Sequence, residues 1–578
     1  MKEKIKCMIR YSVLALVTGV AVGVIDTIFG RGLLWLSDFR TAHYRYLLPF
    51  LPAAGLLIVW MYHRFSEESL KGMTLVLETG QKKRKSIPLA LVPLVIVGTW
   101  LTHLFGGSAG REGVAVQIGA AISHEAGRKF HCPEKDRIML AAGMAAGFGG
   151  LFQTPLAAVF FAMEVIVSGY MQYEALLPAM ISAYTAAFTS HILGLEKFTV
   201  VIGEKLDLSE IKVTLNLIIL GILFGLVGRL FSGTLQWMKK RLGNAIKNPY
   251  IRIGTVAVLL AVLLFFFHGG RYSGLGTNLI SAAFENGTVY GYDWILKLGF
   301  TVLTLAIGFQ GGEVTPLFSI GASLGILAGN LLGISPVVCA ALGYAAVFGS
   351  ATNTLLAPVM IGLEVFGTEN AIPLVVVCIL AYLMNGGSSI YTAQQRAVLK
   401  LDGEKEIEIF QAGRESLEEA VRLVRNTAEK MKEKSWFVAE SLEEFDRWMR
   451  KNQGWLYVAR DRSSGQLAGM FFVVLPGLEE ENLGYDIGMQ GRQLYECAIM
   501  DTVVVLPEYR GMHLQYEMMQ TAERKLRKEG YRYLLCTVHP ENKFSRENVK
   551  RQGYKKMLTK EKYGGFLRDI WMKELENT

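Results

Sequence analysis

The chain has 578 residues, and its 60 Lys and Arg against 51 Asp and Glu give a net charge of +9. These charges are unevenly spread: residues 401–578 hold 59 of them (29 basic, 30 acidic), whereas residues 1–400 hold only 52 (31 basic, 21 acidic). About one charged residue in eight over so long a stretch leaves too little polar surface for a water-soluble globule. A wholly soluble enzyme is therefore excluded, and residues 1–400 are expected to form a transmembrane domain.

Several apolar runs are long enough, or nearly so, to cross about 30 Å of hydrocarbon. They cover residues 11–30, 50–62, 87–105, 215–231 and 253–267. Three other stretches, residues 106–125, 143–165 and 308–333, carry charges or clustered glycines where an ordinary span would carry Leu and Val. Broken helices at membrane depth are tolerated only where protein or a water-filled cavity satisfies their backbone, so they indicate a transport pathway. The expected fold class is an α-helical polytopic membrane protein with broken helices.

Basic residues cluster at residues 2–10, 82–85 and 239–241, and cytoplasmic loops collect such residues. We expect a multi-pass protein of the cell (inner) membrane with the charged tail on the cytoplasmic side; if the clusters are merely solvated loop charge, the orientation stays open. The six cysteines show no disulfide or zinc spacing, which favours a reducing compartment and predicts no metal.

An internal repeat appears when the sequence is shifted by 200 positions. Residues 145–165 (AAGFGGLFQTPLAAVFFAMEV) and 345–365 (AAVFGSATNTLLAPVMIGLEV) are identical at 10 of 21 positions. A glycine-rich break precedes each copy, at residues 106–120 and 308–322. Paired interruptions in two halves predict a substrate site at the repeat interface, and hence a transporter or channel.

Glu112 lies within Gly110-Arg111-Glu112-Gly113, at the start of a predicted helix deep in the apolar part. An acid there is costly unless it faces a cavity. Its anionic form can occupy the positive end of a helix in place of a substrate anion, and its protonated form can leave with a proton, which would make an exchanger. The alternative is a buried Glu paired with Arg111.

Three further acids lie in the apolar part. Glu164 and Glu364 recur at equivalent positions of the repeat, which favours a structural role at helix ends. Glu313 either lines the pore or caps a turn. Helix starts near Thr74, Glu112 and Thr315 offer free N–H groups, so a small anion is the substrate class indicated.

The GREG motif, the GGEVTPLF segment, the helix FQTPLAAVFFAME and a late tyrosine in GGSSIYTAQQ together resemble the CLC family of chloride channels and anion/proton antiporters over about residues 10–400. The resemblance implies a homodimer with one pore per subunit, each built of two inverted repeats. It also implies a gating, proton-carrying glutamate at Glu112, an anion-binding hydroxyl at Tyr391, and a pore lined by Gly110, Arg111, Gly113 and Glu313.

Three departures from the family pattern resemble its fluoride-exporting branch. Met73 replaces the usual serine of the pore mouth, Val114 replaces the proline after GREG, and Thr315 lies in the altered GEVTP segment. The resemblance places Met73, Thr315 and Tyr391 at the anion. The second proton-relaying glutamate of chloride exchangers aligns with Val165, so Glu112 is expected to carry the proton alone. A chloride channel or chloride/proton exchanger remains the alternative.

The soluble tail is expected to contain a linker and first helix over residues 401–429 and an α/β domain over 430–578. Alternating runs at residues 455–460, 466–475, 497–506 and 533–539 predict strands. Between the last two, PEYRGMHL leads into an amphipathic helix ending at Lys528, and such a strand, turn and helix start form a cradle for an anion. An ordinary turn is the alternative.

VVVLPEYRGMHLQYEMM followed by HPENKFSRENVKRQGYKKM resembles the GNAT superfamily of acyl-CoA N-acyltransferases. The resemblance implies that acetyl-CoA pyrophosphate binds the turn and that Asn542 or Asn548 lies by its pantetheine arm. His513 replaces the second glycine of the family's turn, Gln515 replaces a small residue, and Val549 occupies the position of the usual general-acid tyrosine. The turn residues are Arg510, Gly511, Met512, His513 and Leu514.

The sequence therefore predicts a fluoride/proton antiporter with a GNAT-like tail. The tail is either a regulatory module, with or without acyl-CoA binding, or an active N-acetyltransferase acting on an unidentified amine. The expected partners are fluoride or chloride, protons, the lipid bilayer and a second copy of the chain. No nucleic-acid partner is expected, because acids match the basic residues of the tail.

Overall fold

The computed structural model describes residues 2–84, 86–128, 135–285, 287–396, 407–431, 433–437, 440–462 and 464–575. The chain forms two compact units, Met1–Val398 and Leu399–Thr578. Lys85, at the end of one basic cluster, and residues 401–406, at the start of the expected linker, lie outside the described residues.

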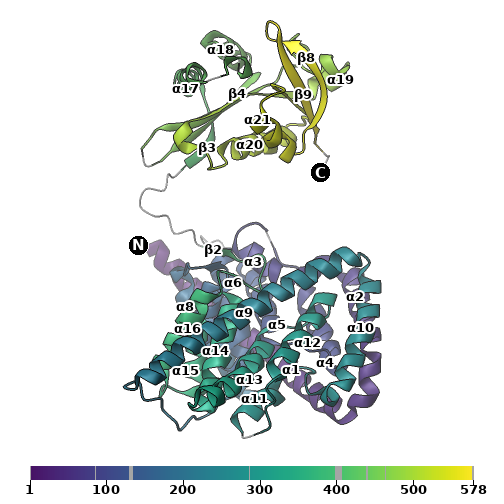
Figure 1. The fold of residues 1–578 in the computed structure, drawn as a ribbon, viewed down its shortest axis with the longest axis vertical. Helices are drawn as coiled ribbons and strands as arrows, with labels where there is room; N and C mark the ends of the chain where they lie inside the picture. Colours follow the sequence, from purple (N-terminus) through teal and green to yellow (C-terminus); the bar gives the residue numbers. More distant parts are fainter. Residues whose placement is uncertain are drawn as a thin grey trace. The chain divides into compact units, whose positions relative to one another are not determined.

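The first unit is almost entirely helical (Figure 1). Four of its helical segments are long and apolar enough to cross a membrane, namely Lys6–Phe65, Ile211–Ala245, Pro249–Phe266 and Val314–Leu332, and several shorter apolar helices accompany them in the described part. The helices are α1 (Lys2–Leu47), α2 (Leu51–Phe65), α3 (Met73–Gly80), α4 (Leu91–Leu104), α5 (Glu112–Arg128), α6 (Lys135–Phe152), α7 (Pro155–Glu164), α8 (Leu176–Ile192), α9 (Ile211–Ala245), α10 (Pro249–Phe266), α11 (Thr277–Phe284), α12 (Asp293–Ile307), α13 (Val314–Leu332), α14 (Pro336–Thr352), α15 (Leu356–Phe366) and α16 (Ala371–Met384).

The internal repeat is visible as two equivalent helix crossings. A Cβ built on Gly119 of α5 would lie 2.0 Å from the carbonyl oxygen of Gly143 in α6. In the second repeat, a Cβ on Gly321 of α13 would lie 2.0 Å from the carbonyl oxygen of Gly343 in α14. Small residues allow membrane helices to approach this closely. Both crossings therefore require glycine, and they fix α5 and α13 against their partners.

The expected breaks also occur at equivalent places. The chain leaves α6 through Gln153 (φ 61°) and leaves α14 through Asn353 (φ 56°), both in the left-handed region. Each turn ends one helix and starts another, α7 or α15, within a few residues. The paired interruptions predicted from the sequence are thus confirmed.

Glu164 and Glu364 cap the two short helices reciprocally. Glu364, in α15, accepts the backbone N–H groups of Leu156 (3.2 Å) and Ala157 (2.8 Å) at the start of α7. Glu164, at the end of α7, accepts the three N–H groups at the start of α15, from Leu355, Leu356 and Ala357, at 2.9–3.3 Å. A carboxylate at a helix start satisfies N–H groups that have no partner within the helix. The structural role expected for these acids at helix ends is confirmed.

The second unit is a seven-stranded sheet of order β3-β4-β5-β6-β7-β9-β8, in which β6 and β7 run parallel and the other neighbours are antiparallel. Helices α17 (Leu417–Lys430) and α18 (Leu442–Arg450) cover one face, and α20 (Leu514–Lys528) and α21 (Lys543–Arg551) cover the other (Figure 1). The strands are β3 (Ile407–Ala412), β4 (Gly454–Asp461), β5 (Leu467–Val474), β6 (Cys497–Val505), β7 (Tyr533–Val538), β8 (Lys555–Lys562) and β9 (Phe566–Glu574).

The expected linker needs a correction. Residues 407–412 pair with β4 as an edge strand, and α17 packs its buried Ala420 and Val424 on the sheet. The charged exterior of α17 suggested a linker, but its opposite face is apolar and belongs to the core. The α/β unit therefore begins before residue 430.

Candidate functional site: an acid at a helix start and a turn beside a cavity

Two loops preceding α5 and α13 are joined by a short antiparallel bridge. Gly110 N–H donates to the Gly312 carbonyl at 2.5 Å, and Gly312 N–H donates to the Gly110 carbonyl at 2.7 Å. A Cβ on Gly110 would lie 2.8 Å from Cδ of Pro316, so a larger residue would push the loops apart. The bridge brings the first turns of α5 and α13, which belong to different repeats, side by side.

Glu112 is held across this junction. Its Oε2 accepts hydrogen bonds from the Thr315 hydroxyl (2.5 Å), the Thr315 N–H (3.1 Å) and the Arg111 N–H (3.3 Å). The side chain has no exposed surface, and its Oε1 lies 3.7 Å from Nε of Arg111. Both sequence interpretations are present together: Glu112 pairs with Arg111 and also occupies the positive start of α13.

Tyr391 contributes a buried hydroxyl with no hydrogen-bond partner among the described residues. Its ring meets Phe161 edge-on at 6.4 Å between centroids. Buried polar groups are nearly always hydrogen-bonded, so an unpartnered buried donor suits an anion. Of the two hydroxyls expected at the anion, that of Thr315 holds Glu112, and that of Tyr391 is buried without a partner among the described residues.

Met73 is the first residue of α3, as expected, and lies half-buried against the apolar core. Gly72 before it has φ +49°, and a Cβ there would meet Oε1 of Gln117 at 3.1 Å. Gln117 in turn donates to the Gly113 carbonyl at 3.1 Å and keeps its buried Oε1 unpartnered among the described residues. The start of α3 therefore lies beside the first turns of α5.

Glu313 occupies the N-cap position of α13 but forms no capping hydrogen bond through its side chain. Its Oε2 would lie 3.6 Å from a Cβ added to Gly113, so Gly113 leaves this carboxylate room. Glu313 therefore does not cap α13 through its side chain, and whether it lines the pore stays a prediction.

The second site is the turn between β6 and α20. Gly511 has φ 86° and His513 has φ 57°, so His513 keeps the left-handed backbone that glycine usually supplies. The helix starts at Leu514, which is buried in the core and also lines the cavity beside the turn. The substitution of His513 for glycine therefore preserves the turn and adds a side chain to it.

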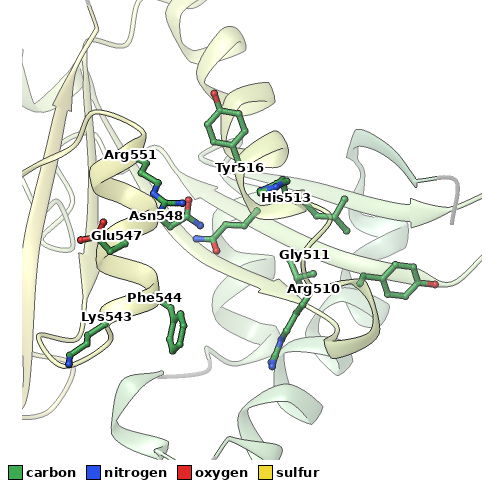
Figure 2. A pocket seen from close by; sticks show the side chains of 13 residues that line it. Arg510, Gly511, His513, Tyr516, Lys543, Phe544, Glu547, Asn548 and Arg551 are labelled. Carbon is green, nitrogen blue, oxygen red and sulfur yellow. The ribbon is translucent and has the colours of Figure 1, made fainter. Parts of the chain in front are cut away.

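A cavity of about 520 Å³ lies against this turn. Figure 2 shows Arg551 and Asn548 of α21 pointing toward His513 and Gly511, while the Arg510 side chain extends down the view from the turn. Arg551 points toward the start of α20, whose first N–H groups have no partner within the helix, and this arrangement suits a phosphate-bearing ligand.

Of the two asparagines expected near the pantetheine arm, Asn548 lines this cavity as well as a neighbouring one of about 640 Å³. Asn542 lines only the latter, and its Oδ1 caps α21 by accepting the Ser545 N–H at 3.1 Å. Val549 is buried in the core, so the position of the family's tyrosine is a packing position here.

The sequence did not single out Asp501, which lines the 640 Å³ cavity from β6. The only signal was an acid among apolar residues in the run IMDTVVV. Among the described residues, no group of three or more His, Cys, Asp or Glu side chains is placed to hold a metal ion.

The membrane unit consists of two repeats, and its broken helices bring an acid of one repeat onto hydrogen-bond donors of the other. This arrangement is typical of an anion-transport protein. Residues 54–386 match the family described as "Voltage gated chloride channel", and residues 421–554 match the "Acetyltransferase (GNAT) family". The chain belongs to the CLC family and carries a C-terminal GNAT domain.

Three similar proteins match the membrane unit. A "Chloride/fluoride channel protein" of Pseudomonas syringae pv. tomato is 34% identical over 393 residues, covering 67% of this chain and 86% of the relative. An H(+)/Cl(-) exchange transporter of Yersinia pestis is 26% identical over 419 residues, covering 66% and 86%. A solved structure described as a CLC-type fluoride/proton antiporter is 50% identical with a TM-score of 0.66, covering 67% of this chain and 98% of that one.

Proposed function

We propose that the membrane unit is a fluoride/proton antiporter that exports fluoride, with Glu112 as its gate and proton carrier. The observation that carries the proposal is the set of three donors, two from Thr315 and one from Arg111, on the buried Glu112 carboxylate. These donors bind a negative charge, and protonation of Glu112 removes that charge. The protonated side chain leaves, and a small anion takes over the donors.

Both the residues proposed at the anion site and the similar proteins favour fluoride over chloride as the substrate. Fluoride is small and strongly hydrated, so it must recover hydrogen bonds from the protein, and the hydroxyls of Thr315 and Tyr391 can supply them. Met73, proposed for the pore mouth, offers a thioether, which has no hydrogen to donate to an anion. The 50% identical structure is that of a fluoride/proton antiporter, and the relative from Pseudomonas syringae is named for both anions.

Flux from reconstituted vesicles tests this function. Vesicles loaded with fluoride should release it and take up protons, and an imposed fluoride gradient should drive proton movement against a pH gradient. Chloride flux equal to fluoride flux would favour a chloride channel or exchanger instead. Fluoride flux without proton movement would identify a channel.

For the tail, we propose a cytoplasmic domain that binds acetyl-CoA at the turn from Arg510 to Leu514. The left-handed backbone at Gly511 and His513 and the adjoining 520 Å³ cavity support this site. In the full chain, acetyl-CoA should bind stoichiometrically in a calorimetric titration, and Arg551→Ala should weaken it. Absence of binding would leave the tail as an interaction module without cofactor.

We also propose that the chain is a homodimer in the inner membrane. CLC membership supports the assembly, and the basic clusters at residues 2–10 and 239–241 support a cytoplasmic tail. Cross-linking in native membranes and protease access to the tail in vesicles of known orientation test the two statements separately.

A further inference from the structure

Strands β6 and β7 separate in the middle of the sheet of the second unit. Their parallel pairing covers only Cys497–Ile499 on β6, although β6 continues to Val505. The 640 Å³ cavity is lined by residues of both strands beyond this point, including Val503, Val504 and Thr537. The divergence therefore opens the sheet to a ligand.

Asp501 is directed by a bulge at this opening. On the β5 side, Phe472 pairs with Thr502 and Val473 pairs with Met500, which leaves Asp501 as the extra residue of β6. Bulges of this kind re-aim a side chain and are common next to active sites. Asp501 lines the cavity, and its Oδ2 accepts the Thr502 hydroxyl at 2.9 Å.

A second acid stands behind Asp501. Glu440 has a buried Oε2 with no hydrogen-bond partner, and neither acid forms an ion pair with any described Lys, Arg or His. Glu444 and Glu481 add negative charge near Glu440, and the nearby Arg447 is engaged by Glu481 at 2.8 Å. Asp501 and Glu440 are both half-buried, and because no described cation neutralises Asp501, its carboxylate is available to a cationic group in the cavity.

The other polar groups around Asp501 and Glu440 do not neutralise the negative charge of these two acids. On β7, the Thr537 hydroxyl bonds the Tyr563 hydroxyl at 3.2 Å, and Arg568 of β9 donates to the Ser435 carbonyl at 2.9 Å. Burial raises the pKa of Asp501, and burial and then the charge of Asp501 raise the pKa of Glu440. The two acids therefore lose their protons at a higher pH than ordinary carboxyl groups do.

The cavity that holds Asp501 is also lined by Arg510 of the proposed acetyl-CoA turn and by Gln515 of α20. We propose that an alkyl diamine or polyamine binds here as the acetyl acceptor, with Asp501 contacting the reacting nitrogen; this rests on the proposed acetyl-CoA site. Glu440 and its acidic neighbours favour an acceptor with a second positive charge. Its hydrocarbon chain suits the aromatic wall formed by Trp436, Phe437 and His539.

The transfer then proceeds by a simple proton path. The bound ammonium gives one proton to Asp501, and the freed nitrogen forms the C–N bond to the acetyl carbonyl carbon. The thioester C–S bond breaks with its electron pair on sulfur, and the second proton of the nitrogen passes to that sulfur. The products are the N-acetylated amine and the free thiol of CoA, with one proton left on Asp501 for solvent.

Calorimetry on the full-length chain in detergent tests the acceptor site without turnover. 1,4-Diaminobutane is titrated with and without CoA, and butane-1,4-diol serves as the uncharged probe of matched length. We expect binding of the diamine only, with affinity rising from pH 6 to pH 8 as the acids lose protons. Asp501→Asn should weaken it at least tenfold, Glu440→Gln should flatten the pH dependence, and Glu561→Gln, an exposed acid on β8, should change nothing.

Three results would overturn the acceptor site: no diamine binding with or without CoA, equal binding of the diol, or unchanged affinity in Asp501→Asn. Acetyl-CoA binding, titrated separately, should be the same in Asp501→Asn as in the unaltered chain, which also reports that the variant is folded. Diamine binding without acetyl-CoA binding would refute the acetyl-CoA proposal alone. Thiol release from acetyl-CoA with diaminobutane, absent with the diol, completes the test.

Discussion

Replacing Glu112 by Gln is the sharpest perturbation of the proposed gate, because it keeps the shape and removes the charge. The carboxylate holds three donors, the hydroxyl and N–H of Thr315 and the N–H of Arg111. Hydrogen bonds to a charged group contribute about 1.5–3 kcal/mol each, and neutral ones about 0.5–1.5 kcal/mol. Losing roughly 1 kcal/mol at each bond weakens the hold on the side chain by about 3 kcal/mol, which corresponds to roughly 100-fold.

The Glu112→Gln side chain should therefore leave the donors more readily, and it has no proton to carry. In vesicles monitored by a fluoride electrode and a pH dye, we expect proton uptake to vanish and the remaining fluoride efflux to be uncoupled. Glu125→Gln is the matched control on the same helix, where it loses only a partly exposed ion pair with Arg128, and it should retain coupling. Proton uptake per fluoride unchanged in Glu112→Gln would refute the single-glutamate mechanism.

Four other changes test individual contacts. Thr315→Val should raise the KM for fluoride about tenfold, since it removes one donor worth about 1.5 kcal/mol, and an unchanged KM in the flux assay would exclude this hydroxyl from the anion site. Glu164→Ala leaves three N–H groups of α15 without their acceptor and should lower stability by about 2–3 kcal/mol, measured as thermal unfolding in detergent. Burial of Asp569 raises its pKa, but hydrogen bonds from Lys556 and Thr559 outweigh this and hold the pKa below its usual value. Its contribution to stability is therefore fully present above about pH 3.9 and is lost as the pH falls through the lowered pKa, so Lys556→Met should speed hydrogen exchange of β8 and β9 at pH 7, with a smaller effect at pH 3. His513→Gly should relieve about 1 kcal/mol of backbone strain and tighten acetyl-CoA binding, whereas weaker binding would make the imidazole a ligand contact.

Much of the membrane unit could be predicted because its internal repeat is detectable in the sequence. The breaks at Gln153 and Asn353 and the recurrence of Glu164 and Glu364 were visible at a spacing of 200 residues. That each of these acids caps the other repeat's helix was not visible, because a capping partner nearly 200 residues away has no local signature. The same holds for Glu112 and Thr315, which meet only through the bridge between two glycine loops.

The soluble unit shows a different limit. Strand positions followed from alternating polarity, but Asp501 faces the cavity because of a bulge, and a one-residue shift in pairing is not encoded in polarity. Residues 407–412 fall in the expected linker because the acidic helical stretch after them favours a linker and first helix, and an edge strand of mostly exposed and half-buried residues gives no signal of its own. This strand belongs to the second unit because it packs against α20 and pairs with β4, which its composition does not reveal.

The contact between the two repeats explains how one acid can act on both the proton and fluoride. Glu112 belongs to the first repeat and Thr315 to the second, so the bound carboxylate is itself a contact between repeats. In the proposed mechanism, protonation abolishes the charge that the donors hold, and release of the side chain exposes the same donors to fluoride. Proton loading and anion entry are then two consequences of a single event. A second relay acid is unnecessary, and its expected position is filled by Val165, which is apolar and fully buried.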